Sequence, residues 1–321
     1  MKNRNSGLVI RVVCYLVFCL FVFLYLYDYQ NDVLAYEQHV LSHGETTYNR
    51  TLGAILITFA SLFLAIAACR VVDAFSRLFE KNSKSAGGQS NANIYRRWWM
   101  KLSCLLICLL TICAIGNNND VFHYRLAAER YIGEGNYDAA LHVGDESLST
   151  DSSLTMLRAL ALSRKGQLGE RLFEYPLTGG SAALYPKGNV KFLMLSQNVF
   201  YTKKKLPADY ILTGYLLDCN LDSFAQNIGK YYHINDSLPK HYREALTLYT
   251  HLRSYPKVIY QNSVMDADFN DLMDMQKKYP ERRSRMTAIR DTYGNTYWCY
   301  YLLRTSSKAF TQSVSKLKRV R

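Results

Sequence analysis

The sequence has 321 residues, a formal net charge of +13 and 49% hydrophobic residues. The excess of Lys and Arg is spread over both halves of the chain, +5 over residues 1–116 and +8 over residues 117–321, which excludes a single basic stripe for nucleic acid. A chain of this length holds two or more domains of ordinary size, and its apolar residues gather in the first third. We therefore divide it into a membrane anchor, residues 1–116, and a helical domain, residues 117–321.

Three apolar stretches, at about residues 8–27, 51–69 and 98–116, have the length that a transmembrane helix needs. About twenty helical residues cross the roughly 30 Å of a hydrocarbon core. Arg11 is the only charged residue of the first stretch, and no small-residue cleavage site follows that stretch. An uncleaved anchor therefore fits better than a signal peptide. The third stretch is the least regular, because Lys101 lies within it and its uncharged core has only about fifteen residues.

The charges of the connecting loops predict the orientation of these spans. Short loops rich in Lys and Arg stay on the cytoplasmic side of a membrane. Residues 28–50 contain four acidic residues and one basic residue, Arg50. Residues 70–101 contain seven basic residues, namely Arg70, Arg77, Lys81, Lys84, Arg96, Arg97 and Lys101. We therefore expect the N-terminus and the middle loop to be cytoplasmic and residues 117–321 to lie outside.

The helical domain begins with a predicted pair of antiparallel helices between residues 124 and 152. Small and aromatic residues share one face of the first helix at i, i+3, i+4 and i+7, a glycine-rich turn follows, and a second amphipathic helix continues the pattern. The residues predicted to pack this repeat are Tyr124, Ala127, Ala128, Tyr131, Gly135, Tyr137, Ala140 and Leu141. Small residues at 128 and 140 allow the two helices to cross closely.

The rest of the chain continues in helical style. One constant shift along the sequence relates Ala159, Leu162, Gly166 and Leu168 to the first repeat, and residues 174–189 form a loop broken by Pro and Gly. Further helices are predicted at residues 190–202, 207–218, 221–233, 239–253, 265–278 and 282–303, with no competing β pattern. The expected fold is all-α: three transmembrane helices followed by a helical-repeat solenoid.

The first repeat resembles the tetratricopeptide repeat, whose unit is one pair of helices. Tyr124, Ala127-Ala128, Tyr131 and Ala140 match its aromatic, Leu-Gly, Tyr and Ala positions, whereas Gly144, Ser147 and Ser152 depart from its pattern. The order of parts also resembles an uncharacterised family of bacterial membrane proteins with a helical-repeat C-terminal half, through LSRKGQLGERLFEYP at 162–176 and GNTYWCYYLL at 294–303. This resemblance implies a bacterial inner membrane with residues 117–321 in the periplasm, and it implies no activity.

Residues that carry chemistry are sparse. His39 and His43 are spaced i, i+4, so in one interpretation they bind a metal together with Glu37 or Glu45. The preferred interpretation is that both are exposed loop histidines without a bound metal. Neither a zinc-type cysteine spacing nor a phosphate-binding loop is present. The carboxylates Asp266, Asp268, Asp271 and Asp274 fit an exposed acidic face. We therefore predict neither a cofactor nor a metal nor an enzymatic activity.

Two functional hypotheses remain. The first is a protein-interaction scaffold at the cell envelope, whose partners are the lipid bilayer and a protein or peptide in the repeat groove. The alternative is an accessory or catalytic component of a glycan- or lipid-handling membrane machine. Cys219 and Cys299 are the two cysteines of the helical domain. Because an extended solenoid separates segments that are distant in the sequence, we expect two buried thiols rather than a disulfide.

Overall fold

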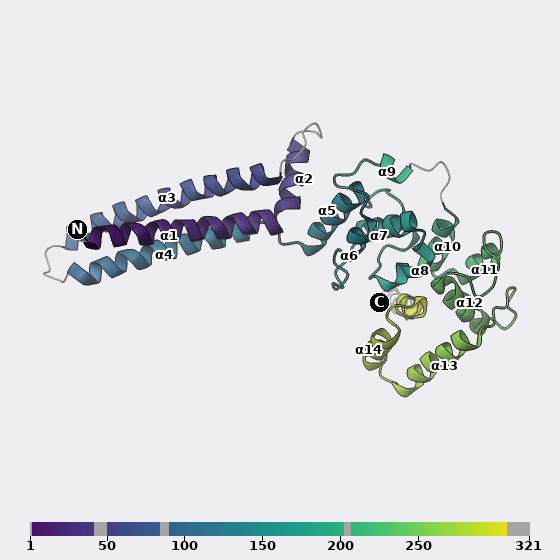
Figure 1. Ribbon diagram of the computed structural model, residues 1–321. Helices are drawn as coiled ribbons and strands as arrows, with labels where there is room; N and C mark the ends of the chain where they lie inside the picture. The colour runs from purple at the N-terminus through teal and green to yellow at the C-terminus, as the bar shows by residue number, and fades with distance from the viewer. Residues whose placement is uncertain (1, 42–49, 84–89, 202–206, 307–321) are drawn as a thin grey trace, which may run out of the picture. The chain divides into compact units, whose positions relative to one another are not determined.

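The computed structural model describes residues 2–41, 50–83, 90–201 and 207–306, and over these residues it contains helices and connecting segments without a strand. The chain divides into two compact units, Met1–Asn119 and Asp120–Arg321, which we describe separately (Figure 1). The all-helical fold class is therefore confirmed for the part of the chain that is described.

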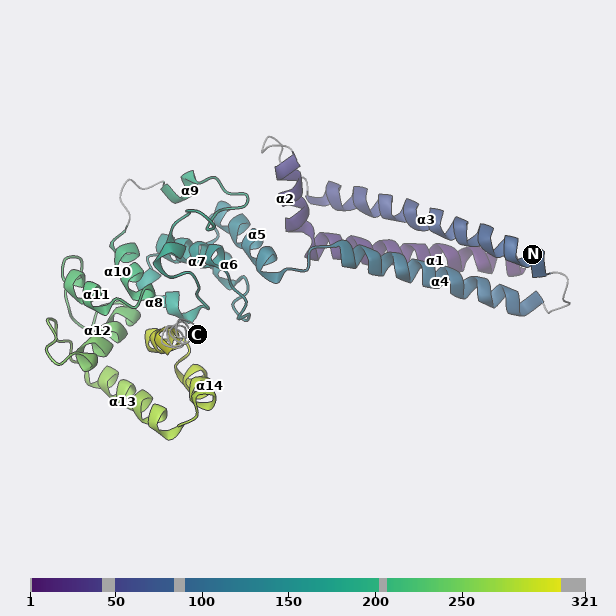
Figure 2. The ribbon, with the colours of Figure 1, turned by 180° about the vertical axis from the view of Figure 1, so that it is seen from behind.

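The first unit is built from three long helices that lie side by side (Figure 1 and Figure 2). They are α1 (Lys2–Leu24), α3 (Arg50–Ser83) and α4 (Ser90–Ile115). Two segments, Val12–Tyr29 and Ala54–Ala74, are long and apolar enough to cross a membrane. A third span is counted only if Trp99–Ile115 is combined with the helix that follows its bend. The chain is therefore a membrane protein with two or three spans.

The interior of this bundle is small and apolar. Phe18, Val22, Ala54 and Ala65 are buried, and the two alanines allow α3 to approach its neighbours closely. At one end, α1 changes into a π-helical turn, η1 (Tyr25–Tyr29), before α2 (Asn31–Leu41).

The Gln30 side chain links two segments at this end of the bundle. The Gln30 side-chain amide donates to the Tyr25 hydroxyl at 2.9 Å and to the Asn117 carbonyl at 2.9 Å, which ties the end of α1 to the residues after α4. This residue is almost fully buried, so both bonds hold the bundle end in a defined geometry.

The second unit consists of short helices. In chain order they are α5 (Asp120–Gly133), α6 (Tyr137–His142), α7 (Ser152–Lys165), α8 (Leu168–Arg171), η2 (Leu172–Glu174), η3 (Gly180–Leu184), α9 (Asn198–Tyr201), α10 (Ala208–Leu217), α11 (Leu221–Ile228), α12 (Lys240–Leu252), α13 (Ser263–Lys278) and α14 (Arg282–Tyr293). Residues 297–306 form a further helix, drawn in yellow in Figure 1. The helix predicted over 282–303 is therefore interrupted after Tyr293, and the helix predicted over 190–202 is wrong for residues 190–197, which are irregular.

Three helix pairs, α5–α6, α7–α8 and α10–α11, share one turn geometry. A residue just after each first helix has a left-handed backbone, with φ of 76° at Gly135, 69° at Gly166 and 60° at Cys219. The next N–H bonds back to a carbonyl five residues earlier in all three turns: Asn136 to Tyr131, Gln167 to Leu162 and Asn220 to Tyr215, at 2.8–2.9 Å. This is the Schellman arrangement that ends a helix. The spacing between Gly135 and Gly166 thus corresponds to a repeated helical hairpin.

The helix at 297–306 packs back against earlier parts of the same unit. The Tyr300 hydroxyl donates to the Leu217 carbonyl at 2.7 Å, and the Phe173 ring lies 5.0 Å from the rings of both Tyr297 and Tyr300. The expectation that segments distant in the sequence remain separated is therefore wrong for this helix. In the described part of the chain no cysteine is in a disulfide, and Cys299 is buried whereas Cys219 is half-buried.

Candidate functional site

The residues predicted to pack the first repeat lie together in the α5–α6 hairpin. Ala128, Ala140 and Leu141 are buried in the main core of the second unit. Around them, the rings of Tyr124, Tyr131 and Tyr137 pack partly buried against the same core, Ala127 is half-buried, and Gly135 lies exposed at the turn. The hairpin in turn packs against α7.

Helix α7 is enclosed on every side from Ser153 to Leu162. Its buried face carries polar side chains that bind the backbone of neighbouring loops. The Arg158 guanidinium donates to the Pro176 carbonyl at 3.2 Å and to the Gly144 carbonyl at 3.1 Å, and the Thr155 hydroxyl accepts from the Thr178 N–H at 3.3 Å. Burial lowers the pKa of Arg158. Sequence reasoning missed Arg158. A charged residue in an apolar helix needs buried partners, but the sequence does not show which carbonyls they are.

A buried carboxylate on α5 binds three consecutive backbone N–H groups. Glu129, which is 0% exposed, accepts from Leu193 at 2.8 Å, from Met194 at 2.8 Å and from Leu195 at 3.1 Å. Burial raises its pKa above the ordinary value, while these bonds oppose that shift. The sequence carries one signal for this site: Glu129 lies between Leu126 and Ile132 at i, i+3, i+6, on an apolar stripe where a carboxylate needs a partner.

The segment of residues 190–199, which ends in the first residues of α9, is held at further points, and we call it the strap. The Arg125 guanidinium donates to the Lys191 carbonyl at 3.0 Å, and the Ser153 hydroxyl accepts from the Lys191 N–H at 3.3 Å. On the other side, Arg164 donates to the Val199 carbonyl at 2.6 Å. Side chains of α5 and α7 thus bind the strap through its backbone.

A second buried polar centre surrounds α12. The Phe173 N–H donates to Nε2 of His241 at 3.3 Å, so Nδ1 carries the proton and donates to Glu244 Oε2 at 2.9 Å. The same carboxylate oxygen accepts from the Tyr297 N–H at 2.7 Å and caps the helix at 297–306. A histidine–carboxylate pair resembles part of a hydrolytic triad, but here Nε2 is engaged by a backbone N–H and cannot take a proton from a nucleophile. The arrangement holds three segments together.

A third cluster anchors the start of α10 to α12. The Asp209 carboxylate accepts from the hydroxyls of Tyr232 at 2.7 Å and Tyr242 at 2.8 Å, and the Thr213 hydroxyl lies 3.3 Å from that of Tyr242. Burial, together with the Asp209 carboxylate, raises the pKa of both tyrosines. The Tyr242 ring lies against Gly169 of α8, where an added Cβ would be 2.6 Å from the ring. This cluster fixes the hairpins relative to one another.

The residues chosen for membrane orientation belong to α3 and α4. Arg70, Arg77 and Lys81 lie on α3, Arg96, Arg97 and Lys101 lie on α4, and Lys84 lies outside the described residues. The Lys101 ammonium is 2.9 Å from the Asp73 carboxylate, so an ion pair joins α3 to α4. Sequence reasoning missed Asp73, although an acidic residue so near a span needs a partner of opposite charge.

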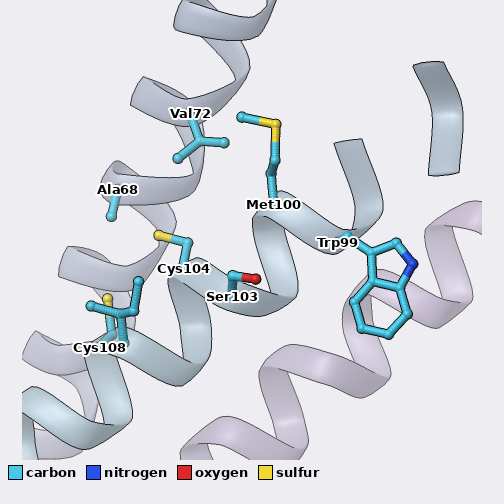
Figure 3. A pocket seen from close by; sticks show the side chains of 8 residues that line it. Ala68, Val72, Trp99, Met100, Ser103, Cys104 and Cys108 are labelled. Atoms are coloured by element: carbon cyan, nitrogen blue, oxygen red, sulfur yellow. The ribbon is translucent and has the colours of Figure 1, made fainter. Parts of the chain in front are cut away.

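An apolar groove runs between α3 and α4 in the same region (Figure 3). It has a volume of about 560 Å³ and is lined by Ala68, Val72, Trp99, Met100, Ser103, Cys104, Ile107 and Cys108. Figure 3 shows the sulfur atoms of Cys104 and Cys108 on the side of α3 and the Trp99 ring on the opposite side. Such a lining suits a hydrocarbon chain, since it is apolar apart from the Ser103 hydroxyl, the Trp99 indole N–H and two thiols.

Metal ligation finds no support in the described ranges, where no group of three His, Cys, Asp or Glu side chains gathers. His43 and Glu45 of the alternative metal pair fall outside those ranges. Four of the ionisable groups that sequence reasoning missed bind backbone groups of this chain, namely Glu129, Arg158, His241 and Glu244.

One family model, described as a family of unknown function, matches residues 1–203 and 193–304. No model of a tetratricopeptide-repeat family matches the chain. No curated protein and no solved structure matches it either. The expected relation to an uncharacterised family is thereby confirmed. The resemblance to tetratricopeptide repeats has no support from the comparisons and stays a prediction.

Proposed function

The chain belongs to DUF6057, a family of unknown function, and on that premise we propose that the protein is a membrane-anchored helical-repeat scaffold that binds a segment of another protein. The observation that carries the proposal is the turn shared by α5–α6, α7–α8 and α10–α11. Repeated helical hairpins that pack side by side build broad surfaces suited to protein segments, as in the solenoid and tetratricopeptide-like architecture that we assign to this unit.

The buried polar centres support a scaffold over a catalyst. Glu129, His241 and Glu244 each hold backbone groups that are distant in the sequence. Groups committed in this way stiffen a framework, because removing one partner would leave a buried polar atom unsatisfied. They are also unavailable to a substrate in this arrangement.

For topology we propose three spans in a bacterial inner membrane, with the N-terminus cytoplasmic and residues 117–321 periplasmic. The apolar part of α4, Trp99–Ile115, measures about 26 Å at 1.5 Å per residue, so its flanking residues must complete a hydrocarbon core of roughly 30 Å. The Asp73–Lys101 pair reduces the cost of placing Lys101 near the membrane. The seven basic residues between 70 and 101 support the orientation.

Reporter fusions test this topology. An enzyme that is active only outside the cytoplasm should be active when fused after Arg321 and inactive when inserted near Ser90. Activity at Ser90 alone would reverse the orientation. Activity at both positions would show that α4 does not cross the membrane.

The scaffold role is tested by crosslinking the full chain in its native membrane and purifying it in mild detergent. We expect one protein to accompany the wild-type chain in a fixed ratio. That protein should be lost with Ala128→Trp, which overfills the α5–α6 crossing, and retained with the matched surface change Asp138→Asn. Recovery in no fixed ratio, or equal recovery with Ala128→Trp, would contradict the scaffold.

The α3–α4 groove favours the second candidate, an accessory component of a lipid- or glycan-handling membrane machine. This role predicts that a lipid or lipid-linked sugar remains bound to the purified protein in native mass spectrometry. Replacing Ser103 by Leu, which fills the groove with an apolar side chain, should remove that ligand. If a protein partner co-purifies and no lipid is bound, the lipid- or glycan-handling role is rejected and the scaffold function is retained.

A further inference from the structure

The strap, residues 190–199, is bound to the second unit as a foreign peptide would be bound. Its contacts with α5 and α7 include six bonds between a side chain of the helices and the backbone of the strap. They use the N–H groups of residues 191, 193, 194 and 195 and the carbonyls of residues 191 and 199. Residues 193–195 are bent, which points their three N–H groups at one carboxylate. Bonds of this type recognise the shape of the main chain and are indifferent to most of its side chains.

Apolar side chains add the second element of peptide recognition. Val190 is 7% exposed within the main core, and Phe192 and Leu195 pack partly buried against it. An added Cβ on Gly133 would lie 3.2 Å from the Leu195 side chain, so α5 approaches the strap closely at that point. The strap therefore combines backbone binding with three apolar anchors.

Glu129 decides what chemistry can replace the strap. Its carboxylate is fully buried, and three strap N–H groups supply its hydrogen bonds. If the strap left without a substitute, this carboxylate would lose those partners in a desolvated position, which is strongly unfavourable. A replacement must therefore bring consecutive free N–H groups that point to one side, and a peptide segment bent like residues 193–195 does so.

Little within the strap itself opposes its departure. Residues 190–197 form no helix or strand, so their contacts do not belong to a cooperative ladder. The backbone bonds that begin or end in this stretch are local, from Val190 to Lys187, from Val199 to Ser196 and from Phe200 to Gln197. The strap can then open without melting α5 or α7.

We propose that α5 and α7 form a peptide-binding site, that the strap occupies it in the resting protein, and that an apolar segment of a partner protein, bent as the strap is, displaces it. The inference rests on the proposed scaffold function and names the class of partner that it binds. Glu129 receives the N–H groups of the incoming segment, Arg125 and Arg164 donate to its carbonyls, and the sites of Val190, Phe192 and Leu195 take its apolar side chains.

The test uses the full chain in detergent and a fluorescent peptide with the sequence of residues 188–200. In the variant Phe192→Asp/Leu195→Asp the strap binds its own site poorly, so the added peptide should bind at least about tenfold more tightly than to the wild type. In that background Glu129→Gln should weaken peptide binding by about tenfold, since the amide keeps one acceptor oxygen where the carboxylate has two, and Asp138→Asn should leave it unchanged. Equal binding by wild type and loosened variant, or no effect of Glu129→Gln, would overturn the proposal.

Hydrogen exchange on the wild-type chain decides the matter if the loosened variant does not fold. The bonded amides of residues 191, 193, 194 and 195 should exchange at least about tenfold faster than those of α7, because opening the strap costs less free energy than unfolding the helix. Equal rates would mean that the strap leaves only on global unfolding, and the proposal would be wrong. A partner protein that co-purifies while the peptide fails to bind would leave the scaffold intact and refute the strap site alone. Peptide binding without a co-purifying partner would support the strap site and contradict the scaffold function.

Discussion

Replacing Gly169 by Ala should destabilise the second unit, because the position has no room for a methyl group. An added Cβ would lie 2.6 Å from Cζ of Tyr242 and 2.9 Å from its hydroxyl oxygen. The Tyr242 ring cannot move aside easily: it is fully buried, its hydroxyl is bonded to Asp209 at 2.8 Å, and the Phe224 ring packs 5.5 Å away.

The magnitude follows from two opposing effects. Overfilling a packed core costs about 1–3 kcal/mol. Replacing a helical glycine by alanine returns about 0.5–1 kcal/mol, because the unfolded chain loses freedom. Taking the middle of each range, we expect Gly169→Ala to lower the free energy of unfolding by about 1 kcal/mol.

Gly214 provides the matched control. It lies in α10, and the nearest atoms to an added Cβ, in Leu184 and Ser181, are 3.7 Å away, which is ordinary contact. Gly214→Ala should therefore stabilise the unit by about 0.5–1 kcal/mol. Urea unfolding of the full chain in detergent, followed by fluorescence of the buried Trp298, measures both changes.

The sign of the two shifts tests the packing. Gly169→Ala should move the midpoint to lower urea and Gly214→Ala to higher urea. In a Tyr242→Phe background, Gly169→Ala should cost less than it does in the wild type, because the hydroxyl is one of the three close atoms. Shifts in the same direction for both glycines would refute the close approach of α8 and α12.

Three further predictions concern the hairpins, the strap and the thiols. Ala128→Trp should lower the melting temperature, since overpacking this buried crossing costs about 1–3 kcal/mol, whereas Asp138→Asn should be nearly neutral. Because burial raises the pKa of Glu129 above 4.5, its contribution to stability is present below that pH and is lost as the pH rises through the raised pKa. The stability advantage of the wild type over Glu129→Gln should therefore fall between acid pH and neutrality, and a constant difference would contradict the shift. Alkylation of the unreduced, denatured chain should label both Cys219 and Cys299, and labelling only after reduction would reveal a disulfide.

Local patterns in the sequence predict most of the helices, but they do not show where a long-range contact keeps a segment from forming a helix. Residues 190–202 have the apolar spacing of a helix, yet residues 190–197 are irregular. The reason lies far earlier in the chain, where Glu129 takes the N–H groups of Leu193, Met194 and Leu195. A single sequence offers no way to see that partner, because the competing hydrogen bonds are long-range.

The buried polar centres were recognisable in part. Glu129 interrupts an apolar stripe, and His241 and Glu244 are spaced i, i+3 on one helix, so their proximity follows from the sequence. Their burial does not follow, since it depends on the helix at 297–306 packing over α12. The predicted repeat residues, by contrast, needed only helical periodicity and a left-handed turn at Gly135.

The return of the helix at 297–306 has a consequence for how the protein is made. This helix supplies Tyr297, Trp298 and Tyr300 to sites around Glu244, Phe173 and Leu217, and all of those partners are synthesised earlier. Emerging hairpins such as α5–α6 and α7–α8 can form during translation, because their contacts are local. The core cannot close until the last of these aromatic residues has left the ribosome. A chain that stops before residue 297 therefore leaves the Glu244 carboxylate without the Tyr297 N–H and its backbone carbonyl without the Trp298 indole N–H. Such a chain should be degraded by proteases.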